Sequence, residues 1–253
     1  MLVKDLVVKD EVSVDIKKDV LDALFLMFSN RRRVVPVLDN SRFVGTISIA
    51  AYAKILRELS ERKPESICVS EVMDAGAATV SPNTELRYVL DMLCNKGVYG
   101  VPVISGHEFI AMVKREDILK KFIPLLKGKL TVMDVMSYYV STNSVHDPLE
   151  NIANKILSGT ERRIVIMDYN TLQGTVDILD LANVLLTEGV DLTAMTVKDI
   201  LSPNTVTVSK YDDATKAGSI MLEWGIWGVA VVDRELEGIV KDKDILQRIY
   251  AII

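Results

Sequence analysis

The stretch Val101-Pro102-Val103-Ile104-Ser105 is an apolar run closed by a polar residue, and three other parts of the chain resemble it. The related stretches are Val35-Pro36-Val37-Leu38-Asp39, Ile164-Val165-Ile166-Met167-Asp168 and Val229-Ala230-Val231-Val232-Asp233. A short, nearly continuous apolar run suits a β-strand that is buried on both faces. The sequence therefore predicts one buried strand in four copies, which is the signature of a repeat protein.

A second landmark precedes each buried strand by about 30 residues. Its four forms are Val3-Lys4-Asp5-Leu6-Val7, Val69-Ser70-Glu71-Val72-Met73, Val132-Met133-Asp134-Val135-Met136 and Val197-Lys198-Asp199-Ile200-Leu201. We expect a turn at each of these places. Both landmarks recur at intervals of about 65 residues and keep their register throughout the chain.

Between the two landmarks, each copy contains a short strand and then a helix. The predicted strands cover 12–14, 78–80, 141–143 and 206–208. The helices follow from apolar residues at i, i+3, i+4, i+7 and i+8. These residues are Val20, Ala23, Leu24, Met27 and Phe28; Leu86, Val89, Leu90, Leu93 and Cys94; Leu149, Ile152, Ala153, Ile156 and Leu157; and Ala214, Ala217, Gly218, Met221 and Leu222.

After the buried strand, each copy continues with a polar turn, a second strand and a final helix. The final helices are predicted to start at Ala51, Asp117, Asp180 and Asp244, with linkers near 57–68, 123–131 and 186–196. The repeat is therefore β-α-β-β-α. A unit of about 55 residues is too small to be stable alone, so we expect repeats to pair and to bury sheet against sheet. Two paired modules follow, 1–126 and 127–253.

Composition disfavours several classes of function. The 253 residues carry a net charge of −5, with no basic excess of the kind that nucleic-acid binding requires. Cys68 and Cys94 have no companions at metal-ligand spacing, and no nucleophile–base set or glycine-rich phosphate loop is visible. The N-terminus does not resemble a signal peptide, and no apolar run reaches the roughly 20 residues that span a bilayer. We therefore expect a cytoplasmic protein that is not an enzyme and has no contact with a membrane.

The four copies resemble the CBS domain family, named for cystathionine β-synthase. The resemblance rests on Val72-Met73-Asp74, on Gly100-Val101-Pro102-Val103 and on the strand–helix junction from Gly238 to Asp244. It implies an α/β fold of four β-α-β-β-α CBS repeats, which form two tandem-pair (Bateman) modules. Repeats 1 to 4 cover 1–58, 67–124, 130–187 and 195–253. The family implies a regulatory sensor that holds an adenosine-containing ligand (AMP, ADP, ATP or S-adenosylmethionine) in clefts between repeats, with no catalytic cofactor.

The copies alternate, and the even ones carry the strongest candidate site. Repeats 2 and 4 share Lys114-x-x-Asp117 and Lys241-x-x-Asp244 at the start of the final helix. A carboxylate there can accept the hydroxyls of a ribose, and a lysine can neutralise a phosphate. The family usually has Ser or Thr where these lysines stand. Repeat 3 keeps Asp180 but has Asp177 in that place, which would repel phosphate, and repeat 1 keeps Ser48 but has Ala51 in place of the aspartate.

Other residues complete the predicted cleft. Tyr99 and Trp227 are candidates to stack on the base, Thr79 and Thr207 to read the adenine edge, and Arg33 and Arg163 to reach the phosphate from the partner repeat. The remaining candidates are the neighbours of these residues along the strands: Val80, Gly100, Val101, Pro102, Val208, Gly228 and Val229.

Each of these residues also has a purely structural interpretation. An aspartate at a helix start is an ordinary N-cap worth about 1 kcal/mol. The lysines can be solvated, and the two aromatic residues can pack at an interface. The alternative functions are therefore a scaffold or oligomerisation module with vestigial clefts, or a sensor of S-adenosylmethionine. A homodimer and a separate effector protein are the expected partners.

Overall fold

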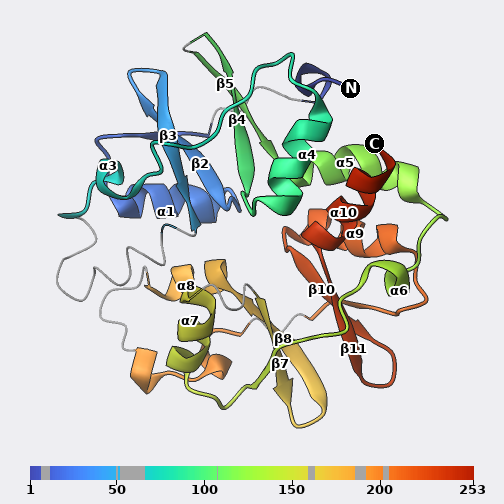
Figure 1. The fold of residues 1–253 in the computed structure, drawn as a ribbon. Helices are drawn as coiled ribbons and strands as arrows, with labels where there is room; N and C mark the ends of the chain where they lie inside the picture. The colour runs from blue at the N-terminus through green and yellow to red at the C-terminus, as the bar shows by residue number, and fades with distance from the viewer. Residues whose placement is uncertain are drawn as a thin grey trace. The chain divides into compact units, whose positions relative to one another are not determined.

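The computed structural model describes residues 1–6, 12–49, 51, 66–106, 108–158, 163–185, 192–201 and 205–253. The chain forms two compact units (Figure 1). The first unit comprises Met1–Lys121 with Ile249–Ile253, and the second comprises Phe122–Arg248. The module boundary predicted at 126/127 stays a prediction. Among the described residues, no helix has the length and apolar character needed to cross a membrane.

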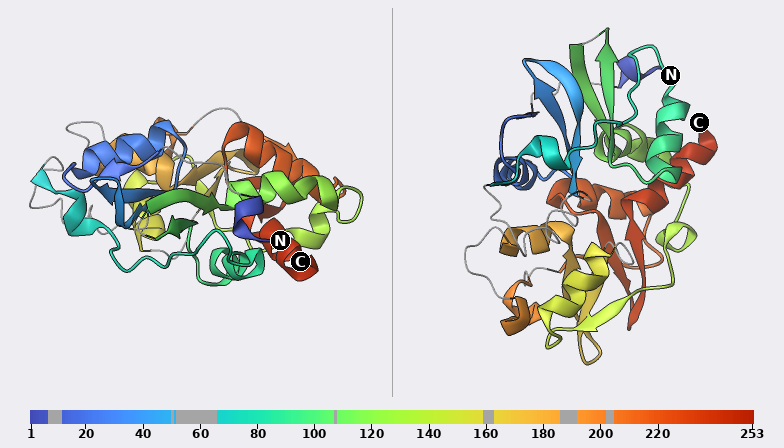
Figure 2. Two further views of the ribbon diagram at one scale, coloured as in Figure 1. Left: turned by 90° about the horizontal axis from the view of Figure 1, so that it is seen from above. Right: turned by 60° about the vertical axis from the view of Figure 1, so that its left-hand side comes forward.

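A five-stranded sheet organises the first unit. Its order is β1 (Val14–Asp15), β2 (Val34–Asp39), β3 (Arg42–Ser48), β5 (Glu108–Lys114) and β4 (Gly100–Ser105). The two hairpins are joined through one residue pair, Arg42 and Glu108, and lie side by side in both sets of views (Figures 1 and 2). The sequence predicts that paired repeats bury sheet against sheet. The edge contact is this one residue pair, and a Cβ at Gly100 of β4 would lie 2.9 Å from Val34 Cγ1 of β2, so the two hairpins also approach each other away from their shared edge. The strand predicted at 78–80 is reduced to a single bridge between Val80 and Val103.

The helices of the first unit are η1 (Val3–Asp5), α1 (Val20–Ser29), α3 (Val69–Val72), α4 (Leu86–Asn95) and the first part of α5 (Arg115–Leu126), which continues into the second unit. The apolar period predicts α1 and α4. Every predicted core residue of α4 is buried, and so are the first four of α1. Phe28 is the exception, because it lies in the last turn of α1 and is 40% exposed.

Helix α5 corrects the predicted linker at 123–131. The helix continues to Leu126 and includes Pro124, although proline removes a backbone hydrogen bond. Three neighbours of the proline, Phe122, Ile123 and Leu126, are buried. Their burial stabilises the last turn despite the proline.

The second unit contains two three-stranded sheets. The first is β6 (Thr142–Ser144), β7 (Arg163–Asp168) and β8 (Thr171–Asp177), and the second is β11 (Leu236–Lys241), β10 (Gly228–Val232) and β9 (Thr207–Val208). The helices are α6 (Val132–Val135), α7 (Leu149–Leu157), α8 (Ile178–Leu185), η3 (Leu192–Ala194), η4 (Val197–Asp199), α9 (Ala214–Trp224) and the first part of α10 (Asp242–Ile252), which ends in the first unit. The predicted β-α-β-β-α order is confirmed in repeats 3 and 4. The final helix of repeat 1 and the linkers near 57–68 and 186–196 fall largely outside the described residues.

The turn that opens each repeat docks on the other repeat of its pair. We call these four segments, residues 3–5, 69–72, 132–135 and 197–199, the leading turns. In the first unit, the Val3 amide donates to the Thr84 carbonyl at 2.9 Å, and the Val69 amide donates to the Lys18 carbonyl at 2.8 Å. In the second unit, the Val132 amide donates to the Asp212 carbonyl at 2.8 Å, and the Val197 amide donates to the Asp147 carbonyl at 3.1 Å. The two repeats of a pair are therefore interlocked.

Glycines make room where the chain that follows a leading turn crosses a strand. Thr46 bridges Asp74, and a Cβ at Gly45 would lie 2.6 Å from the Asp74 carbonyl oxygen. In the second unit, Ser137 bridges Ile239, and a Cβ at Gly238 would lie 2.7 Å from the Ser137 oxygen. Real Cβ contacts are not this short. Only glycine fits beside the crossing backbone at both places.

Candidate functional site

The predicted site aspartates lie in the first turn of a helix. Helices α5, α8 and α10 begin at Arg115, Ile178 and Asp242, two residues before the predicted starts. Each aspartate is therefore the third helical residue and not the N-cap. Its Oδ2 accepts the backbone N–H of the residue three positions earlier. The distances are 2.8 Å from Lys114 to Asp117, 2.7 Å from Asp177 to Asp180 and 2.8 Å from Lys241 to Asp244.

This contact uses one oxygen of each carboxylate. Within the described ranges, Oδ1 of Asp117 and Oδ1 of Asp244 accept no hydrogen bond from the protein. Both side chains are partly buried at the carboxyl end of a strand. The two even repeats thus keep one carboxylate oxygen able to accept a hydroxyl group.

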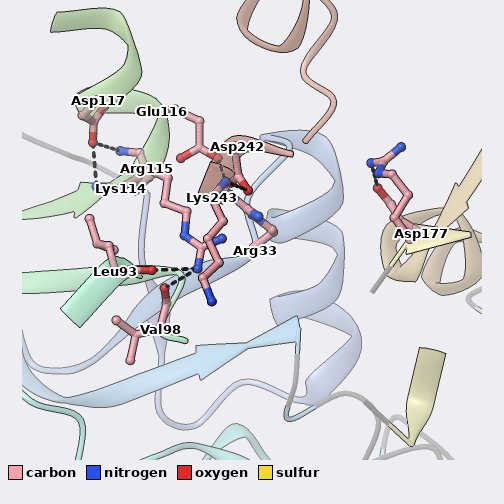
Figure 3. Close-up of polar contacts among 11 residues, drawn as sticks. Arg33, Leu93, Val98, Lys114, Arg115, Glu116, Asp117, Asp177, Asp242 and Lys243 are labelled. Carbon is pink, nitrogen blue, oxygen red and sulfur yellow. Dashed lines mark hydrogen bonds and ion pairs between the residues drawn. The ribbon is translucent and has the colours of Figure 1, made fainter. Parts of the chain in front are cut away.

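The two lysines at these helix starts differ in their ion pairs. The Lys114 ammonium lies 3.3 Å from Asp117 Oδ2, and the pair is shown in Figure 3. Lys241 makes no ion pair with any residue that the structure describes. Lys114 lies across the hairpin from Gly100, and Lys241 lies across from Gly228.

The helix start of repeat 3 contains an ion pair in place of a lysine. Asp177 and Arg163 are paired through the strand ladder, and their side chains form a salt bridge with both groups less than a tenth exposed. The Arg163 guanidinium also donates to Thr175 Oγ1 at 2.6 Å. Asp177 Oδ1 in turn accepts the Leu179 amide at 2.8 Å. The salt bridge between Arg163 and Asp177 therefore fixes the position of both side chains.

Two of the site carboxyls are shifted toward the neutral form. Burial, followed by the nearby Asp177 carboxylate, raises the pKa of Asp180 to about 7. Burial also raises the pKa of Asp244, while the Lys241 amide and the Lys241 charge oppose the shift. Desolvation disfavours the charged form of a carboxyl group, and a second carboxylate does so as well. Both causes act on both groups, since Asp242 is the second carboxylate near Asp244; at Asp244 the Lys241 amide and charge oppose the shift, and Asp180 shows the larger effect.

In the first unit, two arginines flank Tyr99. The Arg33 guanidinium carbon lies 5.1 Å from the ring centroid and that of Arg115 lies 5.8 Å away. Arg33 also pairs with Glu116 at 3.2 Å, so an arginine of repeat 1 does reach the helix start of repeat 2 (Figure 3). The contact between Arg33 and the partner repeat is therefore as predicted, although its role toward a ligand stays a prediction.

Arg33 and Arg163 are not equivalent, which corrects their treatment as a matched pair. Arg33 lies just before β2, whereas Arg163 is the first residue of β7 and matches Val34. A Cβ at Gly228 would lie 3.1 Å from Arg163 Cδ, so Arg163 also lies against the partner repeat. The two arginines reach similar places from different positions on their strands.

The strand residues of the predicted cleft lie where the repeat pattern puts them. Thr79 and Thr207 are exposed, while Val80 is buried beside β4 and Val208 is buried beside β10. Tyr99 and Trp227 are half-buried. Strand β4 of repeat 2 begins with Gly100, Val101 and Pro102, and strand β10 of repeat 4 begins with Gly228 and Val229. Within each repeat the lysine, the aspartate and the glycine come together at one strand end.

Two buried charged residues at the helix starts, Arg115 and Asp242, were not among the site residues predicted from the sequence. Arg115 is 3% exposed and donates to the carbonyls of Leu93 at 2.8 Å and Val98 at 3.4 Å (Figure 3). Asp242, in the same position of repeat 4, is also 3% exposed, and its amide donates to the Trp227 carbonyl at 3.1 Å. The sequence does contain a signal for this position, which appears when the four copies are compared. This position is charged in the even repeats and isoleucine in the odd ones, Ile49 and Ile178.

Comparison with known proteins agrees with this architecture. The family model described as CBS domain matches residues 3–58, 69–123 and 197–251. The CBS domain-containing protein YhcV of Bacillus subtilis is 29% identical over 115 residues, which are 45% of this chain and 82% of that protein. Repeat 3 lies outside the matched ranges, yet it has the same order of helices and strands.

Two solved structures share the fold along nearly the whole chain. Protein MJ1225 from Methanocaldococcus jannaschii superposes with a TM-score of 0.86 at 20% identity, covering 98% of this chain and all of that one. A conserved protein from Pyrococcus horikoshii has a TM-score of 0.66 at 17% identity, covering 98% of this chain and 99% of the other.

Proposed function

The chain belongs to the CBS domain family, and on that premise we propose that it is a regulatory sensor of an adenosine-containing nucleotide: AMP, ADP or ATP. The nucleotide binds in clefts between the paired repeats, at the helix starts of repeats 2 and 4. Binding alters the protein surface, and a separate partner protein responds to the change. A homodimer is part of this proposal.

The observation that carries the proposal is that one carboxylate oxygen of Asp117 and one of Asp244 accept no hydrogen bond from the residues that the structure describes. Each carboxylate is fixed by the backbone N–H of a lysine three residues earlier, so its position is set before any ligand arrives. The oxygen that accepts nothing from the described residues is then oriented for a ribose hydroxyl. An acidic residue performs this task at the ribose of dinucleotides in other folds.

The lysines and the helix ends supply the charge for phosphate. Lys114 and Lys241 precede the first turn of α5 and α10, where helix N–H groups and a partial positive charge favour an anion. Tyr99 and Trp227 lie beside the same strand ends and offer a surface for the base.

Regulation requires that the nucleotide bind one conformation better than another. A ligand shifts an equilibrium only by the difference of its affinities for the two states. A coupling of 1–3 kcal/mol is typical of allosteric proteins. The partner protein then recognises the conformation that the nucleotide favours.

The test is a titration of AMP, ADP and ATP into the wild-type protein and into the double variant Asp117→Asn, Asp244→Asn. Asparagine keeps an oxygen for the backbone N–H and removes the negative charge. The matched control is Asp134→Asn, Asp199→Asn. These aspartates accept a backbone N–H three residues earlier, at 2.7 Å in both cases, but they lie in leading turns. We expect the first double variant to lose nucleotide binding and the control to keep it.

A second function, the scaffold with vestigial clefts, is favoured by the first unit alone. There Lys114 is paired with Asp117, and Tyr99 lies between two guanidiniums, so the protein fills its own contacts. Thermal melting distinguishes the two functions. A ligand at 100 times its Kd adds about 2.7 kcal/mol to stability. A midpoint that does not move with any adenosine-containing ligand, in protein shown to be free of bound nucleotide, would favour the scaffold.

A further inference from the structure

Each leading turn brings a side chain next to the turn of the partner repeat that receives it. In the first unit these side chains are polar, and the Lys4 ammonium donates to Asn83 Oδ1 at 3.0 Å. In the second unit the equivalent of Lys4 is Met133, whose amide donates to the Lys210 carbonyl at 3.0 Å. Tyr211 follows Lys210 and therefore takes the place of Asn83 beside the leading turn.

The four copies differ in character at this place. Where repeats 3 and 4 meet through Met133 and Tyr211, the side chains are apolar or aromatic, and two further tyrosines follow the leading turn at 138 and 139. The other copies have polar or small residues or proline at these four positions: Lys4, Ser70 and Lys198; Lys9, Ala75 and Pro203; Asp10, Gly76 and Asn204; and Lys17, Asn83 and His146. One docking place of the four has thus become aromatic.

Contacts with β11 bring the two further tyrosines to the same place. Ser137 exchanges hydrogen bonds with Ile239 of β11 at 2.9 Å and 3.0 Å, so the chain crosses this strand just after α6 (Figure 1). The two tyrosines follow immediately in the sequence. Lys210 forms an ion pair with Glu237 of the same strand at 2.8 Å. The turn that carries Tyr211 and the segment that carries the other tyrosines therefore meet at β11.

We call Met133, Tyr138, Tyr139 and Tyr211 the tyrosine patch. Their side chains are 45%, 65%, 82% and 72% exposed, respectively. Because a buried aromatic side chain removes about 150–250 Å² from water, the patch exposes roughly 500 Å² in all. Apolar patches of this size on a soluble protein often mark an interaction site.

The chemistry of the tyrosine patch suits contact with a copy of itself. In a two-fold interface the same surface is present on both sides, so an uncompensated charge would face its own kind and repel. The two lysines nearest Tyr211 in the sequence are each paired with a carboxylate, Lys210 with Glu237 at 2.8 Å and Lys216 with Asp212 at 2.7 Å. A phenol hydroxyl both donates and accepts, whereas an ammonium only donates and a carboxylate only accepts. Tyrosine can therefore bond to its own counterpart.

We propose that the tyrosine patch is the surface through which two copies of this chain form a two-fold dimer. The inference rests on the homodimer of the proposed function and names the surface that forms it. Two facing patches bury roughly 1,000 Å², which reaches the lower limit of a specific interface before any surrounding residues are counted. Tyrosine is also among the residues that contribute most of the binding energy at such interfaces.

The experiment is sedimentation velocity of the full chain over a wide range of protein concentration. The patch variant carries Tyr139→Ser and Tyr211→Ser. The matched control carries Tyr88→Ser and Tyr169→Ser, which remove two rings that are 53% and 95% exposed and lie in α4 and in the turn between β7 and β8. We expect the dimer Kd of the patch variant to rise at least about a hundredfold and that of the control to stay unchanged.

The outcomes separate the inference from the proposed function. Equal dimer Kd values for the wild type and the patch variant overturn the inference and leave the homodimer standing. A wild type that stays monomeric overturns both the inference and the homodimer, and leaves the patch to a different protein. Nucleotide sensing is measured by the titrations of AMP, ADP and ATP, so its failure is seen independently of either result.

Opposite charges at one patch residue provide a second test that does not depend on losing an interaction. Tyr139→Lys and Tyr139→Glu are prepared as separate proteins, and their urea midpoints are expected to match the wild type because the side chain is exposed. Each variant alone is expected to be monomeric, since like charges meet across the two-fold axis. An equimolar mixture is expected to recover the dimer. A mixture that stays monomeric overturns the two-fold contact.

Discussion

Asp180 and Asp244 occupy the same position in their helices and titrate differently because their neighbours differ. Asp244 has a lysine three residues before it, whereas Asp180 has Asp177 there. Both are desolvated and lie near a second carboxylate, Asp177 or Asp242. Burial and then Asp177 raise the pKa of Asp180 to about 7, whereas the Lys241 amide and charge oppose the rise in the pKa of Asp244. The difference between Lys241 and Asp177 therefore gives different charges to two helix starts that share their backbone geometry.

The raised pKa of Asp180 predicts a pH dependence of stability. Since its folded pKa lies above the unfolded value of about 4, the folded protein keeps a proton that the unfolded chain releases. The stabilisation is full below about pH 4 and is lost as the pH rises toward 7, at up to about 1.4 kcal/mol per pH unit. Urea unfolding of wild type and Asp180→Asn at pH 5 and 7.5 measures this. The wild type is expected to lose more stability; equal losses would show that Asp180 is ionised throughout.

The two lysines are expected to contribute unequally to nucleotide affinity. Lys114 is already paired with Asp117 at 3.3 Å, so a phosphate must compete with that carboxylate. Lys241 has no such competitor among the described residues. Lys241→Met in the Asp117→Asn background is expected to weaken AMP binding by roughly tenfold, as for loss of one charge-assisted hydrogen bond. Lys114→Met in the Asp244→Asn background is expected to cost less. The reverse order in calorimetry would contradict this.

At the residue scale, the sequence indicates which side chains gather but not how they are bonded. The Lys-x-x-Asp spacing places both residues at a strand–helix junction, and the structure agrees. The two-residue error in the helix starts follows from reading Asp117 as an N-cap, because an acidic residue is favourable both there and one turn inside. The Arg163–Asp177 pair depends on a strand register that a single sequence does not reveal.

The positions of glycine residues determine where a helix ends and where two segments of the backbone can approach closely. Gly225 ends α9 with φ 62°, a left-handed conformation that glycine adopts without steric cost. Gly45 acts differently, since it has no positive φ and is needed because Asp74 crosses it. Amphipathic period alone predicts the helices, since four copies agree. The apolar period does not predict that Asp74 crosses Gly45, because the two segments belong to different repeats.

Adding one methyl group at Gly45 is expected to disturb the crossing. The new Cβ of Gly45→Ala would lie 2.6 Å from the Asp74 carbonyl oxygen and 3.2 Å from Ala75 Cα, so the backbone must move. We expect a loss of about 1–3 kcal/mol in the free energy of unfolding. Gly76→Ala is the matched control, because its Cβ would meet only Asp74 Oδ1 at 3.5 Å. Similar urea midpoints for the two variants would refute the steric argument.

The whole molecule consists of two interlocked pairs of repeats, and this could be foreseen only in part. Four in-phase copies and their alternation predict the pairing. The ranges of the repeats, such as 1–58 and 67–124, do not correspond to separate bodies, because each leading turn docks on its partner. Hydrogen bonds such as that from Leu86 to Met1 join residues too distant in sequence for local patterns to show.

Removal of the first six residues is therefore expected to affect repeat 2 more than repeat 1. The Leu86 amide loses its acceptor on Met1, and the buried Val3 leaves a gap beside the start of α4. Hydrogen exchange followed by mass spectrometry is the measurement. Peptides covering α4 are expected to exchange faster, and peptides covering α1 to keep their protection. Faster exchange confined to α1 would show that the segment belongs with repeat 1.

The docking of leading turns also limits how such a gene can grow. A single additional copy would bring a turn with no surface to receive it and would expose a surface with no turn to cover it. Lengthening by two copies at once avoids both defects. We therefore expect a deletion that removes one copy to be more harmful than one that removes a docked pair.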